Sequence, residues 1–150
     1  MEPMTSPTLR LSTPVDAHRL LEIWEAAVRA THHFLTEADI DALRPQVRAY
    51  VSTASFELAT DERGAVCGFL GMTGSNIDSL FVHPDAHGRG LGRALVDHAA
   101  ALHPVLTVDV NEQNPGARAF YARLGFEVVG RSETDDAGRP FPLLHLRRVV

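Results

Sequence analysis

Apolar side chains in the first fifty residues recur at the three- and four-residue spacing of helices. Residues 15–30 carry one apolar face. Ser12 and Thr13, followed by Pro14, precede them and are typical of the start of a helix. A second helix is expected over 36–50, with a capping box at its start, and Pro45 should interrupt or kink it. A short strand at 8–11 comes before both helices.

After residue 55 the pattern changes to short apolar runs separated by turn residues, which is typical of strands. Two later segments return to helical spacing, and each is followed by another apolar run. This order predicts an α+β fold with a mixed sheet of about six or seven strands flanked by helices. Strands are expected at 56–60, 66–72, 77–82, 105–110, 126–129 and 143–149, and helices at about 92–102 and 115–124.

Composition narrows the class of protein. The chain has 150 residues, 45% of them hydrophobic and 22% charged, which fits one globular domain spanning 1–150. A net charge of -5 argues against a nucleic-acid partner and suits a cationic acceptor. We expect a cytoplasmic protein without a membrane segment, because no apolar stretch is long enough for a span and the N-terminus is polar. The single Cys67 lies in an apolar run, so a buried thiol is expected.

A glycine-rich segment between a strand and a helix carries the strongest chemical signal. The strand ends at Val82, and glycines follow at 88, 90 and 92, where the next helix begins. Free N–H groups and the positive end of the helix dipole make such a helix start an anion site. Glycines let the backbone approach a phosphate closely, and Arg89 and Arg93 add positive charge. The segment therefore predicts a phosphate-bearing ligand, with a flexible turn as the alternative.

Two common phosphate-binding loops do not fit this segment. A Walker loop requires a lysine followed by serine or threonine after its last glycine, and no lysine occurs here. The dinucleotide fingerprint G-x-G-x-x-G fails because Arg93 stands where its third glycine belongs. A nucleotide-phosphate binder is accordingly disfavoured.

The residues His87, Gly88, Arg89, Gly90, Leu91 and Gly92 resemble the acetyl-CoA motif [R/Q]-x-x-G-x-[G/A] of the GNAT acetyltransferase superfamily, although His87 replaces its usual arginine or glutamine. About twenty residues later, the segment 111–126 is similar to the family signature N-x-x-A-x-x-[FL]-Y-x-x-x-G-F. The two motifs occur in the family's order on a strand-helix-strand scaffold. The likeness covers about residues 56–130 and is greatest to small bacterial single-domain members.

The resemblance implies a GNAT fold, in which a twisted mixed sheet has a V-shaped split between two central parallel strands. Coenzyme A would bind there, with the backbone at Phe81 and Val82 pairing with pantetheine. It further implies that Tyr121 protonates the departing thiolate and that Asn114 hydrogen-bonds the coenzyme. Packing in the core is the alternative role for Tyr121, and capping the helix is a natural role for Asn114. The implied cofactor set comprises Phe81, Val82, His87, Gly88, Arg89, Gly90, Gly92, Arg93, Asn114 and Tyr121.

The acceptor side is less constrained by the sequence. Asp78 and Glu112 are the candidates for the general base, and both could equally be surface carboxylates. His32 and His33 lie between the first two helices, a region that borders the acceptor pocket in this fold, and solvation is their simpler role. No metal site is expected, because neither paired-histidine spacing nor a cysteine cluster occurs.

These observations predict an acetyl-CoA-dependent N-acetyltransferase that acts on a primary amine by direct attack in a ternary complex. The acceptor is a small molecule or a peptide, and a homodimer is possible on general grounds. Two rivals remain: a catalytically inactive acyl-CoA-binding regulatory protein, which the substitution at His87 would suit, and an acetyltransferase that acts on charged tRNA.

Overall fold

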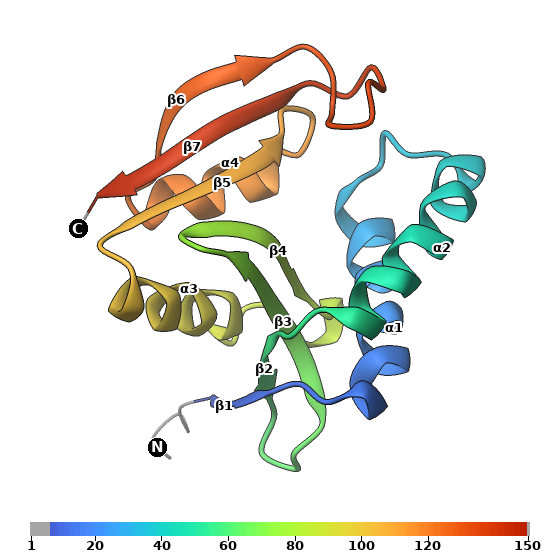
Figure 1. Cartoon of the computed structure of the whole chain (residues 1–150), viewed down its shortest axis with the longest axis vertical. Helices are drawn as coiled ribbons and strands as arrows, with labels where there is room; N and C mark the ends of the chain where they lie inside the picture. Colours follow the sequence, from blue (N-terminus) through green and yellow to red (C-terminus); the bar gives the residue numbers. More distant parts are fainter. Residues whose placement is uncertain (1–6, 150) are drawn as a thin grey trace. The chain divides into compact units, whose positions relative to one another are not determined.

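The computed structural model describes residues 7–149, which form two compact units (Figure 1). The first unit contains residues 7–71 and 79–96, and the second contains 72–78 and 97–149. Strands β3 (Val66–Thr73) and β4 (Asn76–Val82) and helix α3 (Leu91–Leu102) each contribute residues to both units.

The first unit contains two helices and a small antiparallel ladder. Its complete elements are β1 (Thr8–Leu11), the 3-10 turn η1 (Pro14–Asp16), α1 (Ala17–Thr31), α2 (Glu37–Thr53), β2 (Glu57–Thr60) and the 3-10 turn η2 (Pro84–Ala86). Strand β2 pairs with both β1 and β3, and helices α1 and α2 lie side by side (Figure 1).

Helix α2 is longer than its sequence predicts. It runs from Glu37 to Thr53 with Pro45 inside it, so of the two expected effects of Pro45 the interruption is wrong, and a kink stays a prediction. A proline removes one backbone hydrogen bond of a helix. The helix persists because both ends are held: Thr36 and Asp39 form the predicted capping box, and the Ala54 N–H donates to the Tyr50 carbonyl over 3.1 Å.

The apolar face of α1 is the centre of the core in this unit. Phe69 packs edge-on against Phe56, with the ring centroids 5.3 Å apart. Cys67 is buried beside this core, as predicted, and burial raises the pKa of its thiol. The cluster consists of Leu20, Ile23, Trp24 and Val28 from α1, Ile40 and Val51 from α2, and Phe56, Leu58, Val66 and Phe69 from the strand region.

The complete elements of the second unit are a three-stranded ladder and one helix packed against it. Strand β7 (Leu143–Val149) lies between β5 (Val105–Asn111) and β6 (Glu127–Ser132), antiparallel to both, and α4 (Pro115–Arg123) contacts β5 (Figure 1). Side chains alternate between the two faces of a strand. Leu144 and Leu146 line a shallow hollow together with residues of α4, so the odd-numbered residues of β7 point to the opposite face.

Residues 7–149 contain a seven-stranded mixed sheet with the order β1-β2-β3-β4-β5-β7-β6. The predicted α+β fold is confirmed, and so is parallel pairing of β4 with β5, which joins Asn76 to Thr107 and Ile77 to Val108. The V-shaped split between these two strands stays a prediction. No helix among the described residues is both long enough and apolar enough to cross a membrane.

Candidate active site

The glycine-rich loop of the first unit has the backbone shape that an anion cradle requires. Gly88 and Gly90 have φ values of 78° and 77°, in the left-handed region where side chains are strained. A Cβ built on either residue would meet no atom within 4 Å, so the space above the loop is open. The loop leads into the 12-residue helix α3, whose first N–H groups have no acceptor inside the helix. These residues fit a bound phosphate.

The side chain of His87 points back to the end of β4, the strand that precedes the loop. Its Nε2 lies 3.1 Å from the Val82 carbonyl oxygen, and because a carbonyl only accepts, this nitrogen carries the proton. The backbone N–H of His87 donates to the Pro84 carbonyl over 3.2 Å. In this conformation the His87 side chain binds the last residue of β4, a contact that the sequence motif does not indicate.

Strand β4 approaches β3 very closely in front of this loop. A Cβ on Gly68 would lie 3.1 Å from the Phe81 carbonyl oxygen, and the His83 N–H donates to the Cys67 carbonyl over 2.7 Å. A side chain at position 68 would therefore press on β4 at Phe81 and Val82, and that strand would have to shift by a few tenths of an ångström.

In the second unit, Tyr121 is a buried phenol on α4. Its ring packs edge-on against Phe120 and Phe126, with centroid distances of 5.0 and 5.2 Å, and only 6% of the residue is exposed. Burial raises the pKa of Tyr121 above its ordinary value, because the ionised phenolate would lose its solvation. The phenol therefore keeps its proton, as a proton donor must, while the ring also contributes to the core.

Asn114 caps α4. Its Oδ1 accepts a hydrogen bond from the Ala117 N–H over 3.1 Å, directly before Pro115 at the first helical position. The capping role predicted for Asn114 is confirmed.

The two candidate bases are both occupied by neighbouring side chains. Asp78 accepts hydrogen bonds from the Thr73 hydroxyl and, over 2.8 Å, from Asn76 Nδ2. Glu112 forms a two-pronged ion pair with Arg131, at 2.5 and 3.1 Å, which lowers the pKa of Glu112. Since a lowered pKa weakens a base, Glu112 is poorly suited to remove a proton.

The histidine pair lies where α1 meets α2, and the two side chains have different environments. His33 is exposed, whereas His32 is mostly enclosed, and desolvation followed by repulsion from His33 lowers the pKa of His32 to about 4. The Thr31 hydroxyl donates to the Ala27 carbonyl, so at 2.8 Å it accepts from His32 Nδ1. His32 is thus neutral at physiological pH, with one ring nitrogen fixed as a donor.

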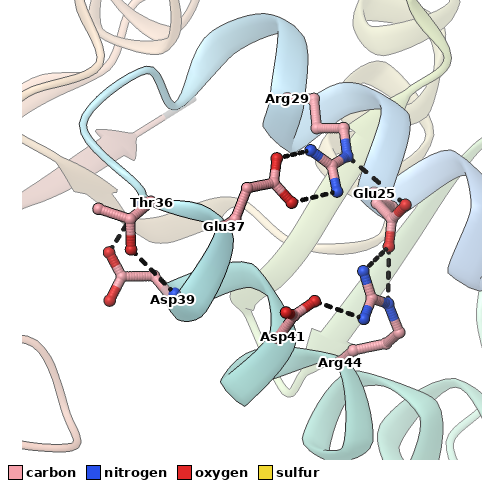
Figure 2. Close-up of polar contacts among 7 residues, drawn as sticks. All are labelled: Glu25, Arg29, Thr36, Glu37, Asp39, Asp41 and Arg44. Carbon is pink, nitrogen blue, oxygen red and sulfur yellow. Dashed lines mark hydrogen bonds and ion pairs between the residues drawn. The ribbon is translucent and has the colours of Figure 1, made fainter.

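A network of ion pairs ties the helices on either side of this turn together (Figure 2). Glu25 on α1 binds Arg44 on α2 at 2.6 Å and Arg29 at 3.5 Å. Arg29 also binds Glu37, and the capping box between Thr36 and Asp39 starts α2 beside them (Figure 2). The turn that carries His32 and His33 is therefore anchored on both sides.

A further polar arrangement in the second unit escaped the sequence analysis, which assigned no role to His145. Its Nδ1 lies 2.6 Å from Asp109 Oδ1, and its Nε2 lies 2.7 Å from Ser132 Oγ. These residues come from β5, β7 and β6 and are separated by 36 and 13 positions in the chain. Only the strand register brings them together, so no local motif could have indicated them.

Known proteins match both the sequence and the fold. A family model described as "Acetyltransferase (GNAT) domain" matches residues 52–128. The peptidyl-lysine N-acetyltransferase YjaB of Escherichia coli strain K12 is 43% identical over 142 residues, covering 95% of this chain and 97% of that protein. The solution structure of apo-form YjaB from Escherichia coli superposes with a TM-score of 0.92 at 42% identity, over 97% and 99% of the two chains.

A more distant structure has the same fold. The structure of YncA from Salmonella typhimurium, solved with its cofactor acetyl-CoA, gives a TM-score of 0.66 at 21% identity and covers 97% of this chain and 94% of that one.

The glycine loop at a helix start, the mixed sheet and the matched family model together define an acyl-transferring enzyme of the N-acetyltransferase class. The chain belongs to the GNAT acetyltransferase family. Among residues 7–149, no group of three or more histidine, cysteine or acidic side chains is arranged to hold a metal ion.

Proposed function

We propose that this N-acetyltransferase transfers the acetyl group of acetyl-CoA to the side-chain amine of a lysine in a peptide or protein. The observation that carries the proposal is the 43% identity, over nearly the whole of both chains, to a relative named peptidyl-lysine N-acetyltransferase. The same coverage supports one acetyltransferase domain over 1–150, and a cytoplasmic location is part of the proposal. An inactive regulatory protein is disfavoured, because relatives that match nearly the whole chain are named as N-acetyltransferases.

The donor site is proposed at the loop before α3. Backbone N–H groups around Gly88, Gly90 and Gly92 would hold the pyrophosphate, and Arg89 and Arg93 would add charge-assisted hydrogen bonds. Phe81 and Val82 would offer their backbone to the pantetheine amides, in the manner of an added strand. The carbonyl oxygen of Val82, which has two lone pairs, accepts one hydrogen bond from His87 Nε2. Asn114 completes the proposed set.

In the proposed mechanism, Tyr121 holds the proton that the thiolate takes up as it leaves. A phenol whose pKa is raised by burial stays protonated until a strong base forms beside it. The acceptor side is proposed at the turn between α1 and α2, where neutral His32 and exposed His33 would contact the substrate. Asp78 and Glu112 stay candidates for the base, with Glu112 the weaker because of Arg131.

The proposal is tested by measuring thiol release from acetyl-CoA in the presence of lysine peptides whose N-termini are blocked. Wild type should release thiol and add an acetyl group to the lysine, as detected by mass spectrometry. Tyr121→Phe should lower kcat by about 10²- to 10⁴-fold while leaving folding nearly unchanged, because the ring packing is retained. Peptides with blocked lysine and a free N-terminus are the control. Transfer to these alone would refute the lysine assignment.

A further inference from the structure

The face of the β5-β7-β6 ladder that points away from α4 carries a continuous chain of three polar side chains. His145 lies directly opposite Asp109 on β5 and Gly130 on β6, in the register of the two strand pairs. Ser132 lies two residues beyond Gly130 on β6, and its side chain reaches diagonally across to His145. The side chains of His145 and Asp109 are 34% and 41% exposed, so a ligand from solvent can reach them.

The hydrogen bonds fix the direction in which a proton can travel. The carboxylate of Asp109 only accepts, so His145 Nδ1 carries the hydrogen in their 2.6 Å contact. Nε2 of the neutral ring is then an acceptor, and the Ser132 hydroxyl donates to it over 2.7 Å. The lone pairs of Ser132 Oγ remain available to a donor from outside. A carboxylate behind a histidine orients the ring and stabilises its protonated form.

The backbone is shaped to admit this ring. The register of β6 with β7 shifts between Val128 and Gly130, as in a β-bulge. A Cβ on Gly130 would lie 3.2 Å from Cδ2 of His145, so a larger residue at this position would press on the imidazole. The bulge and the glycine together hold the imidazole between its two partners.

A second observation on the same face indicates a ligand. Asn111 lies two residues beyond Asp109 on β5 and directly opposite Leu143, so it shares the face of His145. Its Oδ1 is buried and has no hydrogen-bond partner among the described residues. A buried acceptor without a partner is destabilising, and a hydrogen bond from a substrate N–H would satisfy it.

Few charged side chains of the described residues lie on the same face of the ladder as Ser132, His145 and Asp109. Asp109 is in contact with His145, and Arg147, two residues further along β7, lies opposite Glu127 of β6. Neither alternative base has a comparable arrangement, because both oxygens of Asp78 are engaged and Glu112 is paired with Arg131.

We propose that Ser132, His145 and Asp109 form the proton relay that converts the acceptor's ammonium group into the attacking amine. The ammonium donates a hydrogen bond to Ser132 Oγ. One proton then passes from the ammonium nitrogen to Oγ while the hydroxyl proton of Ser132 passes to His145 Nε2. The products are a neutral amine and an imidazolium whose Nδ1–H bonds the Asp109 carboxylate, and the imidazolium returns its proton to water. The inference rests on the proposed function, since it requires a protonated amine acceptor.

The test compares two acceptor peptides in the full chain, one with lysine and one with an aminooxy side chain that is already neutral at the assay pH. His145→Ala should lower kcat with the lysine peptide by about 10²-fold or more, while losing less than about tenfold with the aminooxy peptide. The KM for acetyl-CoA should stay within about twofold, and added imidazole should restore part of the lysine activity. Ser132→Ala, a smaller change, should show the same preference between acceptors. His18→Ala, on an exposed part of α1, is the matched control.

Equal losses with both peptides, or no loss with either, would overturn the relay. Melting curves of each variant separate loss of folding from loss of proton transfer, and Ser132→Ala decides the question if His145→Ala unfolds. A wild-type chain that acetylates no lysine peptide would refute the proposed acceptor instead. The same comparison, made with whichever amine wild type accepts and a neutral analogue of it, then decides the relay.

Discussion

Gly71 on β3 is the position where the structure tolerates a side chain least. A Cβ built there would lie 2.4 Å from the Tyr50 hydroxyl oxygen, 2.6 Å from Ser79 Oγ and 2.9 Å from Cε1 of Phe56. The two oxygens are hydrogen-bonded to each other at 2.9 Å, and Ser79 is buried. Gly71→Ala must therefore separate the pair or displace a core ring.

The expected cost follows from these contacts. Separating the pair leaves the buried Ser79 hydroxyl without Tyr50, which costs about 1–3 kcal/mol. Forcing a methyl group into a filled core adds about 1–3 kcal/mol. We expect the free energy of unfolding to fall by about 2–6 kcal/mol, and for a chain of this size each kcal/mol lowers Tm by about 2–4 °C.

Thermal melts and urea titrations of four proteins test this reasoning: wild type, Gly71→Ala, Tyr50→Phe and the double variant. Tyr50→Phe removes the oxygen nearest to the new methyl group, so the double variant should lose less stability than the two single variants added together. A Tm for Gly71→Ala within about 1 °C of wild type, or simple additivity in the double variant, would show that the methyl group is accommodated without disturbing Tyr50.

Three further outcomes are expected. Arg10, 2.8 Å away, lowers the pKa of Asp16 to about 2, so Asp16→Asn should reduce the free energy of unfolding at neutral pH by about 1 kcal/mol, a figure reduced for solvent screening. In urea titrations this difference should be full above the unfolded value of 3.8 and vanish as pH falls towards 2. Gly90→Ala should raise the KM for acetyl-CoA about five- to thirtyfold with kcat nearly unchanged, whereas Gly64→Ala, equally left-handed but in the β2-β3 turn, should leave that KM unaltered. Glu25→Gln should lower Tm more at low salt than at high salt, because it removes the acid shared by two arginines.

Most of the fold could be predicted because the hydrophobic pattern and the capping signals agree. Thr36 and Asp39 cap α2 as expected, and Asn114 caps α4. The interruption expected at Pro45 does not occur for a physical reason: a proline costs one hydrogen bond, and the held helix ends together with tertiary contacts such as that between Arg44 and Glu25 compensate for it. The local sequence indicates the hydrogen bond lost at Pro45 but not the tertiary contacts that compensate for it.

Some features of the candidate site could likewise be predicted from local sequence, and others could not. The loop at Gly88 and Gly90 could be predicted, because left-handed backbone and a helix start both leave local signals. The pairing of Glu112 with Arg131 could not, since the partners are 19 residues apart and meet only after folding. The position of His87 in the motif was recognised, but its contact with Val82 depends on a side-chain rotation that no motif encodes.

In the proposed reaction, Tyr121 and His145 of the second unit would perform two opposite proton functions. Burial between aromatic rings raises the pKa of Tyr121, so the phenol keeps its proton until a strong base appears. His145 stands instead between an accepting carboxylate and a donating hydroxyl on the polar face of the ladder, and these two hydrogen bonds orient its ring. An acyl transfer to an ammonium acceptor needs both functions, one proton removed from the nucleophile and one supplied to the leaving group. If the relay is correct, variants at His145 and Tyr121 should therefore respond differently to a change of acceptor: the loss at Tyr121 should be similar for lysine and aminooxy peptides, because both reactions release the same thiolate.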